Sequence, residues 1–111
     1  MKRARWNGVV IAEADRTVQV EGNDYFPPES LHREYFIETP TRSLCPWKGI
    51  ASYYAVTDGD EVAADAAWTY RHPSPLARRI KNHVAFWGGV VVEDVPDGDV
   101  CLPGDGAGAS A

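Results

Sequence analysis

The sequence has few cysteines and no long apolar runs. It contains only two cysteines, Cys45 and Cys101, which are far apart and do not form the Cys-x-x-Cys pairs of a structural zinc site, so no metal is expected. No stretch approaches the roughly 20 apolar residues of a membrane span. No apolar run follows Met1–Asn7 as it would in a secretory signal. We therefore expect a cytoplasmic protein with reduced thiols and no membrane partner.

Basic residues are also scarce. The formal net charge is −5 over 111 residues, which argues against nonspecific nucleic-acid binding because such binding needs cations to neutralise phosphates. One basic cluster stands out, made of Arg71–His72, Arg78–Arg79, Lys81 and His83. It could bind a phosphate or carboxylate, although a solvated helix face is the more common role of such a cluster.

Short apolar runs separated by turn residues indicate an all-β, mainly antiparallel fold. Strands are expected at 2–6, 9–12, 17–21, 33–39, 48–56, 62–70 and 86–92. Helical turns are expected at 29–32 and 76–83, and Pro40 and Pro46 are expected to bracket a loop. Residues 1–95 should form one domain. Residues 96–111 have few apolar side chains and are expected to be a disordered tail.

The best-defined unit is a predicted hairpin over 48–70. If Asp58-Gly59 is a two-residue turn, Ala51 lies opposite Ala66 and Gly49 opposite Trp68. Large rings and small residues would then share one face, which would hold Cys45, Trp47, Tyr53, Trp68 and Tyr70. Lys48, Asp65 and Arg71 would point to the other face. Because strand faces alternate, a slip of one residue would exchange these sets.

The ring face has two interpretations. Tryptophan, tyrosine and alanine commonly interleave in a packed core. The same residues can also form a pocket for a planar or carbonyl-bearing ligand, with Cys45 and Lys48 at its mouth and Arg71 anchoring an anion at the rim. Cys45 and Lys48 are the catalytic candidates, since an ammonium favours a thiolate. A base for Cys45 would have to come from His32, His72 or His83 through the fold.

Several strings taken in order resemble a known family. They are Tyr25-Phe26-Pro27, Thr41, Cys45-Pro46, Lys48-Gly49, Ala51, Tyr53, Ala67-Trp68, Tyr70, Pro73, Ile80 and Phe86. Together they look like the bacterial family catalogued as domain of unknown function 427, which carries a nucleotidyltransferase-like label. The resemblance runs from about residue 2 to 95. It implies a compact β-tent-like or Mss4-like sheet domain, here with one or two short helices and no zinc.

Three functions are therefore carried forward. The first is small-molecule binding in an aromatic pocket on the 45–70 hairpin, lined by Trp47, Tyr53, Trp68 and Tyr70 with Arg71 at the rim. The second is a transferase that either uses Cys45 or Lys48 or performs the nucleotidyl transfer suggested by the label. The third is an interaction module, such as a homodimer formed through strand edges or a tryptophan-rich surface. No cofactor is expected for any of them.

Overall fold

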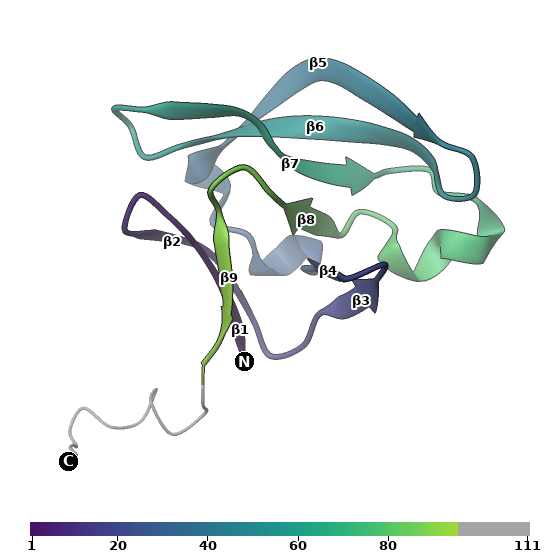
Figure 1. Ribbon diagram of the computed structural model, residues 1–111, viewed down its shortest axis with the longest axis horizontal. Coiled ribbons are helices and arrows are strands. Elements are labelled where there is room, and N and C mark those ends of the chain that lie inside the picture. Colours follow the sequence, from purple (N-terminus) through teal and green to yellow (C-terminus); the bar gives the residue numbers. More distant parts are fainter. Residues whose placement is uncertain (96–111) are drawn as a thin grey trace.

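The computed structural model describes residues 1–95; the predicted tail at 96–111 lies outside the described residues. The described chain is all-β and antiparallel, with three short 3-10 turns (Figure 1). The strands are β1 (Lys2–Trp6), β2 (Val9–Ala14), β3 (Val18–Val20), β4 (Asn23–Tyr25), β5 (Phe36–Cys45), β6 (Gly49–Thr57), β7 (Val62–Tyr70), β8 (Val84–Phe86) and β9 (Val91–Asp94). The 3-10 turns are η1 (Pro28–Ser30), η2 (Arg33–Tyr35) and η3 (Pro75–Ile80). The all-β prediction is confirmed.

The strands form three sheets. β2, β1 and β9 make a three-stranded sheet, β3 and β4 make a hairpin, and β5-β6-β7-β8 make a four-stranded sheet in that order. The last predicted strand region is in fact two strands in two sheets, because the chain turns between Phe86 and Val91. β9 pairs with β1 and brings the end of the described chain back to its beginning (Figure 1).

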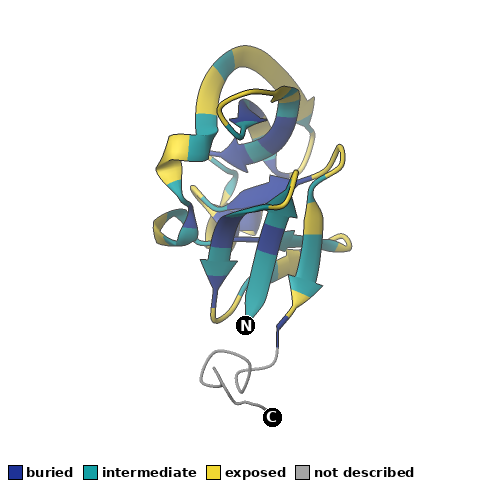
Figure 2. Ribbon diagram, turned by 90° about the vertical axis from the view of Figure 1, so that its left-hand side faces the viewer, coloured by how far each residue is buried: buried dark blue, intermediate teal, exposed yellow. Residues whose placement is uncertain are grey.

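Two apolar clusters cover the two faces of the four-stranded sheet. One joins it to the three-stranded sheet and contains Ile11, Phe26, Tyr54, Val56 and Phe86. The other lies against the β3–β4 hairpin and η3, and its buried members are Val20, Tyr25, Ala51, Tyr70, Ala77, Ile80 and Ala85. Buried residues accordingly gather where the elements meet, whereas the loops are largely exposed (Figure 2).

The expected loop around Pro40 is wrong, because β5 runs through it. Pairing between β5 and β6 is interrupted between Glu38 and Arg42, so Pro40 lies in an irregular part of an edge strand, where a missing N–H is tolerated. Asp65 holds this region: its carboxylate accepts hydrogen bonds from the hydroxyls of Thr39 and Thr41, each 2.8 Å long. Asp65 therefore holds the irregular part of β5 in place.

The predicted register of the 48–70 hairpin is also wrong. The turn contains Asp58 to Glu61, since Thr57 pairs with Val62, and pairing shifts again between Tyr54 and Val56. Ala51 therefore lies opposite Tyr70 and Tyr53 opposite Trp68. The Asp58 carboxylate accepts hydrogen bonds from the N–H groups of Asp60 and Glu61, and these bonds stabilise the longer turn. Both shifts keep Tyr53, Trp68 and Tyr70 on one face, as the sequence predicts.

Candidate functional site

The ring face forms a packed cluster around a buried lysine. Lys48 is only 6% exposed, and its ammonium contacts the Glu21 carboxylate from the turn between β3 and β4. The Lys48 Nζ also lies 5.3 Å from the Trp47 ring centroid and 5.6 Å from that of Tyr70, within the range of cation–π attraction. The Trp47 indole donates a hydrogen bond of 3.2 Å to Glu21. Lys48 therefore lies with the rings and not on the opposite face, because it belongs to the β5–β6 turn rather than to a strand.

The surroundings of Lys48 favour its charged form. Burial alone would lower the pKa of Lys48, but its hydrogen bond to Glu21 and the nearby phenols and thiol outweigh burial, so the pKa is raised. Hydrogen bonds from Lys48 and Trp47 lower the pKa of Glu21. At neutral pH the pair is thus an ammonium and a carboxylate. An ammonium group is a poor nucleophile. The charged Lys48 is therefore better suited to binding a ligand or stabilising the fold than to covalent catalysis.

The other rings of this face are mostly packed against one another. Tyr70 is 5% exposed, and the Trp68 indole donates a hydrogen bond of 3.1 Å to the Tyr25 hydroxyl. The Tyr53 hydroxyl is 2.9 Å from the Ser43 hydroxyl. Cys45 is partly exposed and borders the cluster, and its thiol has no hydrogen-bond partner among residues 1–95. The sequence-predicted residues are brought together here, with the exception of Arg71.

Tyr70 provides a pH-dependent test of this packing. Burial, partly opposed by Lys48, raises its pKa to about 12, compared with about 10 for an unfolded tyrosine. The folded state therefore holds a proton that the unfolded state loses, so the stability associated with Tyr70 is present below pH 10 and is lost as the pH rises toward 12. We expect Tyr70→Phe to reduce the loss of unfolding free energy between pH 9 and pH 11.5, measured by urea titration. An equal loss in both proteins would show that the Tyr70 hydroxyl is not buried in solution.

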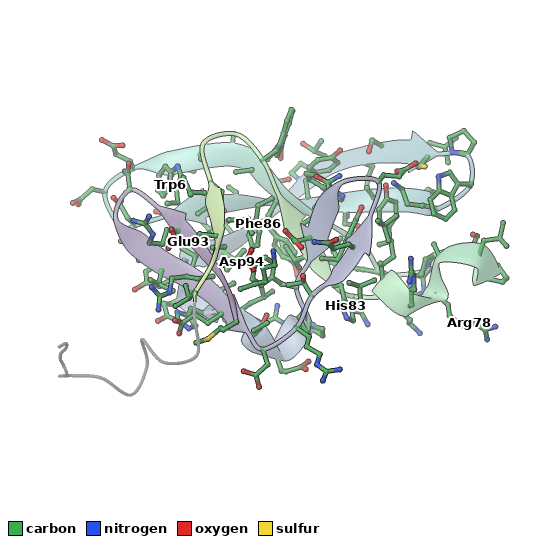
Figure 3. All side chains as sticks on the ribbon, turned by 60° about the horizontal axis from the view of Figure 1, so that its bottom comes forward. Trp6, Arg78, His83, Phe86, Glu93 and Asp94 are labelled. Atoms are coloured by element: carbon green, nitrogen blue, oxygen red, sulfur yellow. The ribbon has the colours of Figure 1, made fainter. Side chains whose placement is uncertain are left out.

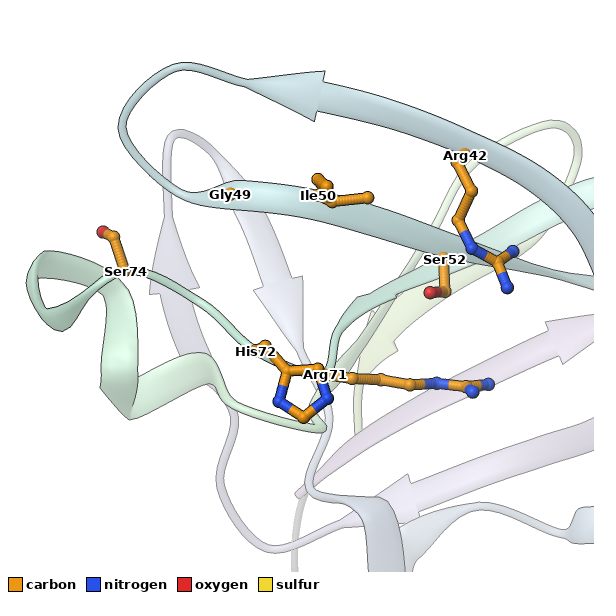
Figure 4. A pocket seen from close by; sticks show the side chains of 7 residues that line it. All are labelled: Arg42, Gly49, Ile50, Ser52, Arg71, His72 and Ser74. Atoms are coloured by element: carbon orange, nitrogen blue, oxygen red, sulfur yellow. The ribbon is translucent and has the colours of Figure 1, made fainter.

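Arg71 lies on the opposite face, in a groove. This basic groove has a volume of about 610 Å³ and is lined by Arg42, Gly49, Ile50, Ser52, Arg71, His72 and Ser74 (Figure 4). Ser74 and Gly49 lie at one end, and the two arginines flank Ser52 at the other. Arg42 lies directly across from Ser52 in the β5–β6 pairing. The fold thus assembles three basic side chains from β5 and from the segment that follows β7.

The end of the groove depends on Gly49. Its φ of +115° is unfavourable for other residues, and a Cβ there would lie 3.4 Å from the His72 carbonyl oxygen. The Ser74 N–H donates a hydrogen bond of 3.0 Å to the Lys48 carbonyl, and the Ser74 hydroxyl donates to that of Trp47. These contacts hold the segment with Arg71 and His72 against the start of β6.

The arginines of the groove differ in how their charge is engaged. Arg42 donates to the backbone carbonyls of Thr39 and Thr41, which orient it without neutralising it. Arg71 lies 3.3 Å from a Glu38 carboxylate oxygen, but that side chain is 72% exposed. An ion pair open to water contributes little, about 0–1 kcal/mol. Arg71 can therefore exchange Glu38 for an incoming anion at low cost.

A buried hydroxyl lies beside the groove. Thr69 is opposite Ser52 in the β6–β7 pairing and is 1% exposed, and its Oγ1 has no hydrogen-bond partner among the described residues. A buried unpaired hydroxyl is unfavourable by about 1–3 kcal/mol. We expect Thr69→Val to raise the unfolding free energy by about 1 kcal/mol in chemical denaturation. Destabilisation by a similar amount would mean that the hydroxyl has a partner in solution.

The rest of the basic cluster does not contribute to the groove. Arg78 points outward from η3 (Figure 3), and Arg79 donates a hydrogen bond of 3.5 Å to the Gln19 carbonyl. His83 and His32 contact backbone carbonyls through Nδ1. Sequence reasoning missed Arg42 and Ser52. Pairing of β5 with β6 places Arg42 opposite Ser52. This pairing was not predicted from the sequence, because a loop was expected after Pro40.

Residues 1–95 also lack two kinds of feature. No group of three or more His, Cys, Asp or Glu side chains there is placed to hold a metal ion. No helix in that range has the length and apolar character needed to cross a membrane.

The fold and the groove define a small antiparallel β domain with a basic groove on one face of its main sheet. The chain belongs to the family described as domain of unknown function DUF427, whose model matches residues 2–97 and bears the name NTP_transf_9. The resemblance seen in the sequence is thereby confirmed, including the nucleotidyltransferase-like label. No curated protein matches the chain.

Proposed function

We propose that this domain binds a small molecule on its main sheet and that the anionic group of the ligand occupies the basic groove, which is lined by β5, β6 and the segment after β7. The observation that carries the proposal is the convergence of Arg42, Arg71 and His72 on one hollow of an otherwise acidic chain. Guanidinium groups match carboxylate and phosphate oxygens in geometry as well as charge. The Ser52 and Ser74 hydroxyls add neutral hydrogen-bonding groups to the same lining.

The aromatic face is the second candidate location for a ligand. Trp47 is 37% exposed beside the Lys48–Glu21 pair, which offers a ring and a charge to a molecule arriving at the β5–β6 turn. Trp68 and Tyr53 are half-buried there, whereas Tyr70 contributes mainly packing. Ligand binding by this face stays a prediction. The transferase alternative also stays a hypothesis. Its candidate nucleophile Lys48 contacts the carboxylate of Glu21.

A thermal-shift screen separates the two faces. Inorganic phosphate, short carboxylates and nucleotides are tested on the wild type, since a ligand that binds only the folded state raises its melting temperature. For the groove, we expect stabilisation to persist in Cys45→Ser and Trp47→Ala and to be lost in Arg42→Ala. Stabilisation that is lost in Trp47→Ala and kept in Arg42→Ala would move the site to the aromatic face. No stabilisation by any anion would contradict the proposal.

A further inference from the structure

Two large aliphatic side chains lie exposed beside the basic groove. Leu44 and Ile50 pair across β5 and β6, and they are 74% and 59% exposed. Both lie on the groove face, because Leu44 follows Arg42 by two residues and Ile50 precedes Ser52 by two. We refer to Leu44 and Ile50 as the apolar shelf. Isolated exposed aliphatic residues are ordinary, but a cross-strand pair at the edge of a binding groove is a feature of ligand sites.

The shelf and the groove are continuous. A shallower hollow of about 250 Å³ is lined by Arg42, Ser43, Leu44 and Ile50. It shares Arg42 and Ile50 with the basic groove. A single molecule can therefore contact both, with its charged end between the arginines and its other end against Leu44.

Resting on the proposed function, we infer that the ligand is an amphipathic anion: a phosphate or carboxylate that carries an aliphatic or aromatic body. The acid group binds between Arg42 and Arg71, and the apolar body lies on the shelf. The charge of the groove selects the anionic end, and burial of the two aliphatic side chains favours a ligand that is apolar beyond that end. A free inorganic anion would leave Leu44 and Ile50 exposed.

Calorimetric titration of the full chain with methyl, butyl and hexyl phosphate tests this inference. A body lying on a one-sided shelf buries about half of its surface, so each added methylene should tighten binding about twofold. Hexyl phosphate should therefore bind about 30-fold more tightly than methyl phosphate. In the Leu44→Ser/Ile50→Ser variant this gain should fall to a few-fold. Because Ile50 also lines the basic groove, the readout is the ratio of the hexyl phosphate affinity to the methyl phosphate affinity within each protein. Val62→Ser is the matched control, since Val62 is also 59% exposed but lies at the far end of the hairpin.

The possible outcomes separate this inference from the function on which it rests. Equal affinities for all three phosphates, with binding still lost in Arg42→Ala, would overturn the amphipathic ligand and leave anion binding intact. No binding of any of the three would overturn both. A chain-length gain that survives the double serine variant would place the body elsewhere and overturn the role of the shelf.

A second copy of the chain is the competing occupant of the shelf. Light scattering on the wild type and on Leu44→Ser/Ile50→Ser distinguishes it. We expect the same mass for both. A wild-type dimer that becomes a monomer in the variant would assign the shelf to self-association and overturn the inference.

Discussion

Replacing Arg71 with alanine is expected to weaken the binding of an anionic ligand by about 10- to 100-fold, because hydrogen bonds to charged groups contribute about 1.5–3 kcal/mol. Arg71 extends beside Ser52 at the end of the groove that also holds Arg42 (Figure 4). It is partly exposed, its hydrogen bond to the Tyr54 hydroxyl is long at 3.5 Å, and its ion pair with Glu38 spans 3.3 Å. The substitution should therefore affect binding far more than folding. Titration calorimetry with a phosphate ligand measures the change, and denaturation of the same sample measures the folding.

Glu38→Gln is the matched control for this experiment. Glu38 competes with the ligand for Arg71, so its neutralisation should tighten binding by up to about fivefold, as expected for an exposed ion pair of at most 1 kcal/mol. A general loss of structure would weaken binding in both variants, so it would not explain weaker binding in Arg71→Ala together with tighter binding in Glu38→Gln. Binding that is unaffected by Arg71→Ala would exclude the groove as the anion site.

The largest effect on stability is expected for Phe26→Ala, at about 3–5 kcal/mol. Phe26 is completely buried, and its ring contacts that of Phe86 edge-on at 5.4 Å. Its backbone also exchanges hydrogen bonds of 2.7 and 2.9 Å with Val84. It therefore connects the segment after β4 to the last strand of the four-stranded sheet. Removing the ring would leave a cavity in the cluster that joins the two larger sheets.

Urea denaturation of Phe26→Ala and Leu76→Ala makes the comparison direct. Leu76 is 79% exposed on η3, so its truncation should change the unfolding free energy by no more than about 0.5 kcal/mol. A loss of less than about 1 kcal/mol in Phe26→Ala would contradict the packing described for this core.

Local patterns predicted the strands well and their partners poorly. Alternation and turn residues identified β1, β2, β6 and β7, since these depend on neighbouring residues. Pro40 was misinterpreted because proline normally ends a strand. Side-chain contacts, including those of Asp65 with Thr39 and Thr41, hold β5 together there. The hairpin register depended on a turn stabilised by the Asp58 side chain, which an Asp-Gly pair alone does not specify.

The parts of the candidate site that depend on residues close together in the sequence were predictable. The pairing of Tyr53 with Trp68 preserved the predicted ring face, and the Cys45–Lys48 turn lies beside it. Arg71 was predicted to anchor an anion. Strand alternation already placed it on the face opposite the rings, where it lines the basic groove. Arg42 could not be found, because its proximity to Arg71 is created by β5 pairing with β6 over a break in register.

Amide and indole chemical shifts, followed by NMR during titration with butyl phosphate, test the central claim most directly. If the anion binds in the basic groove, the largest changes should occur at the amides of Ser52, Arg71 and His72, while the indole signals of Trp47 and Trp68 on the opposite face change little. Changes centred on those two indoles, with the amides of Arg71 and His72 unaffected, would contradict the account.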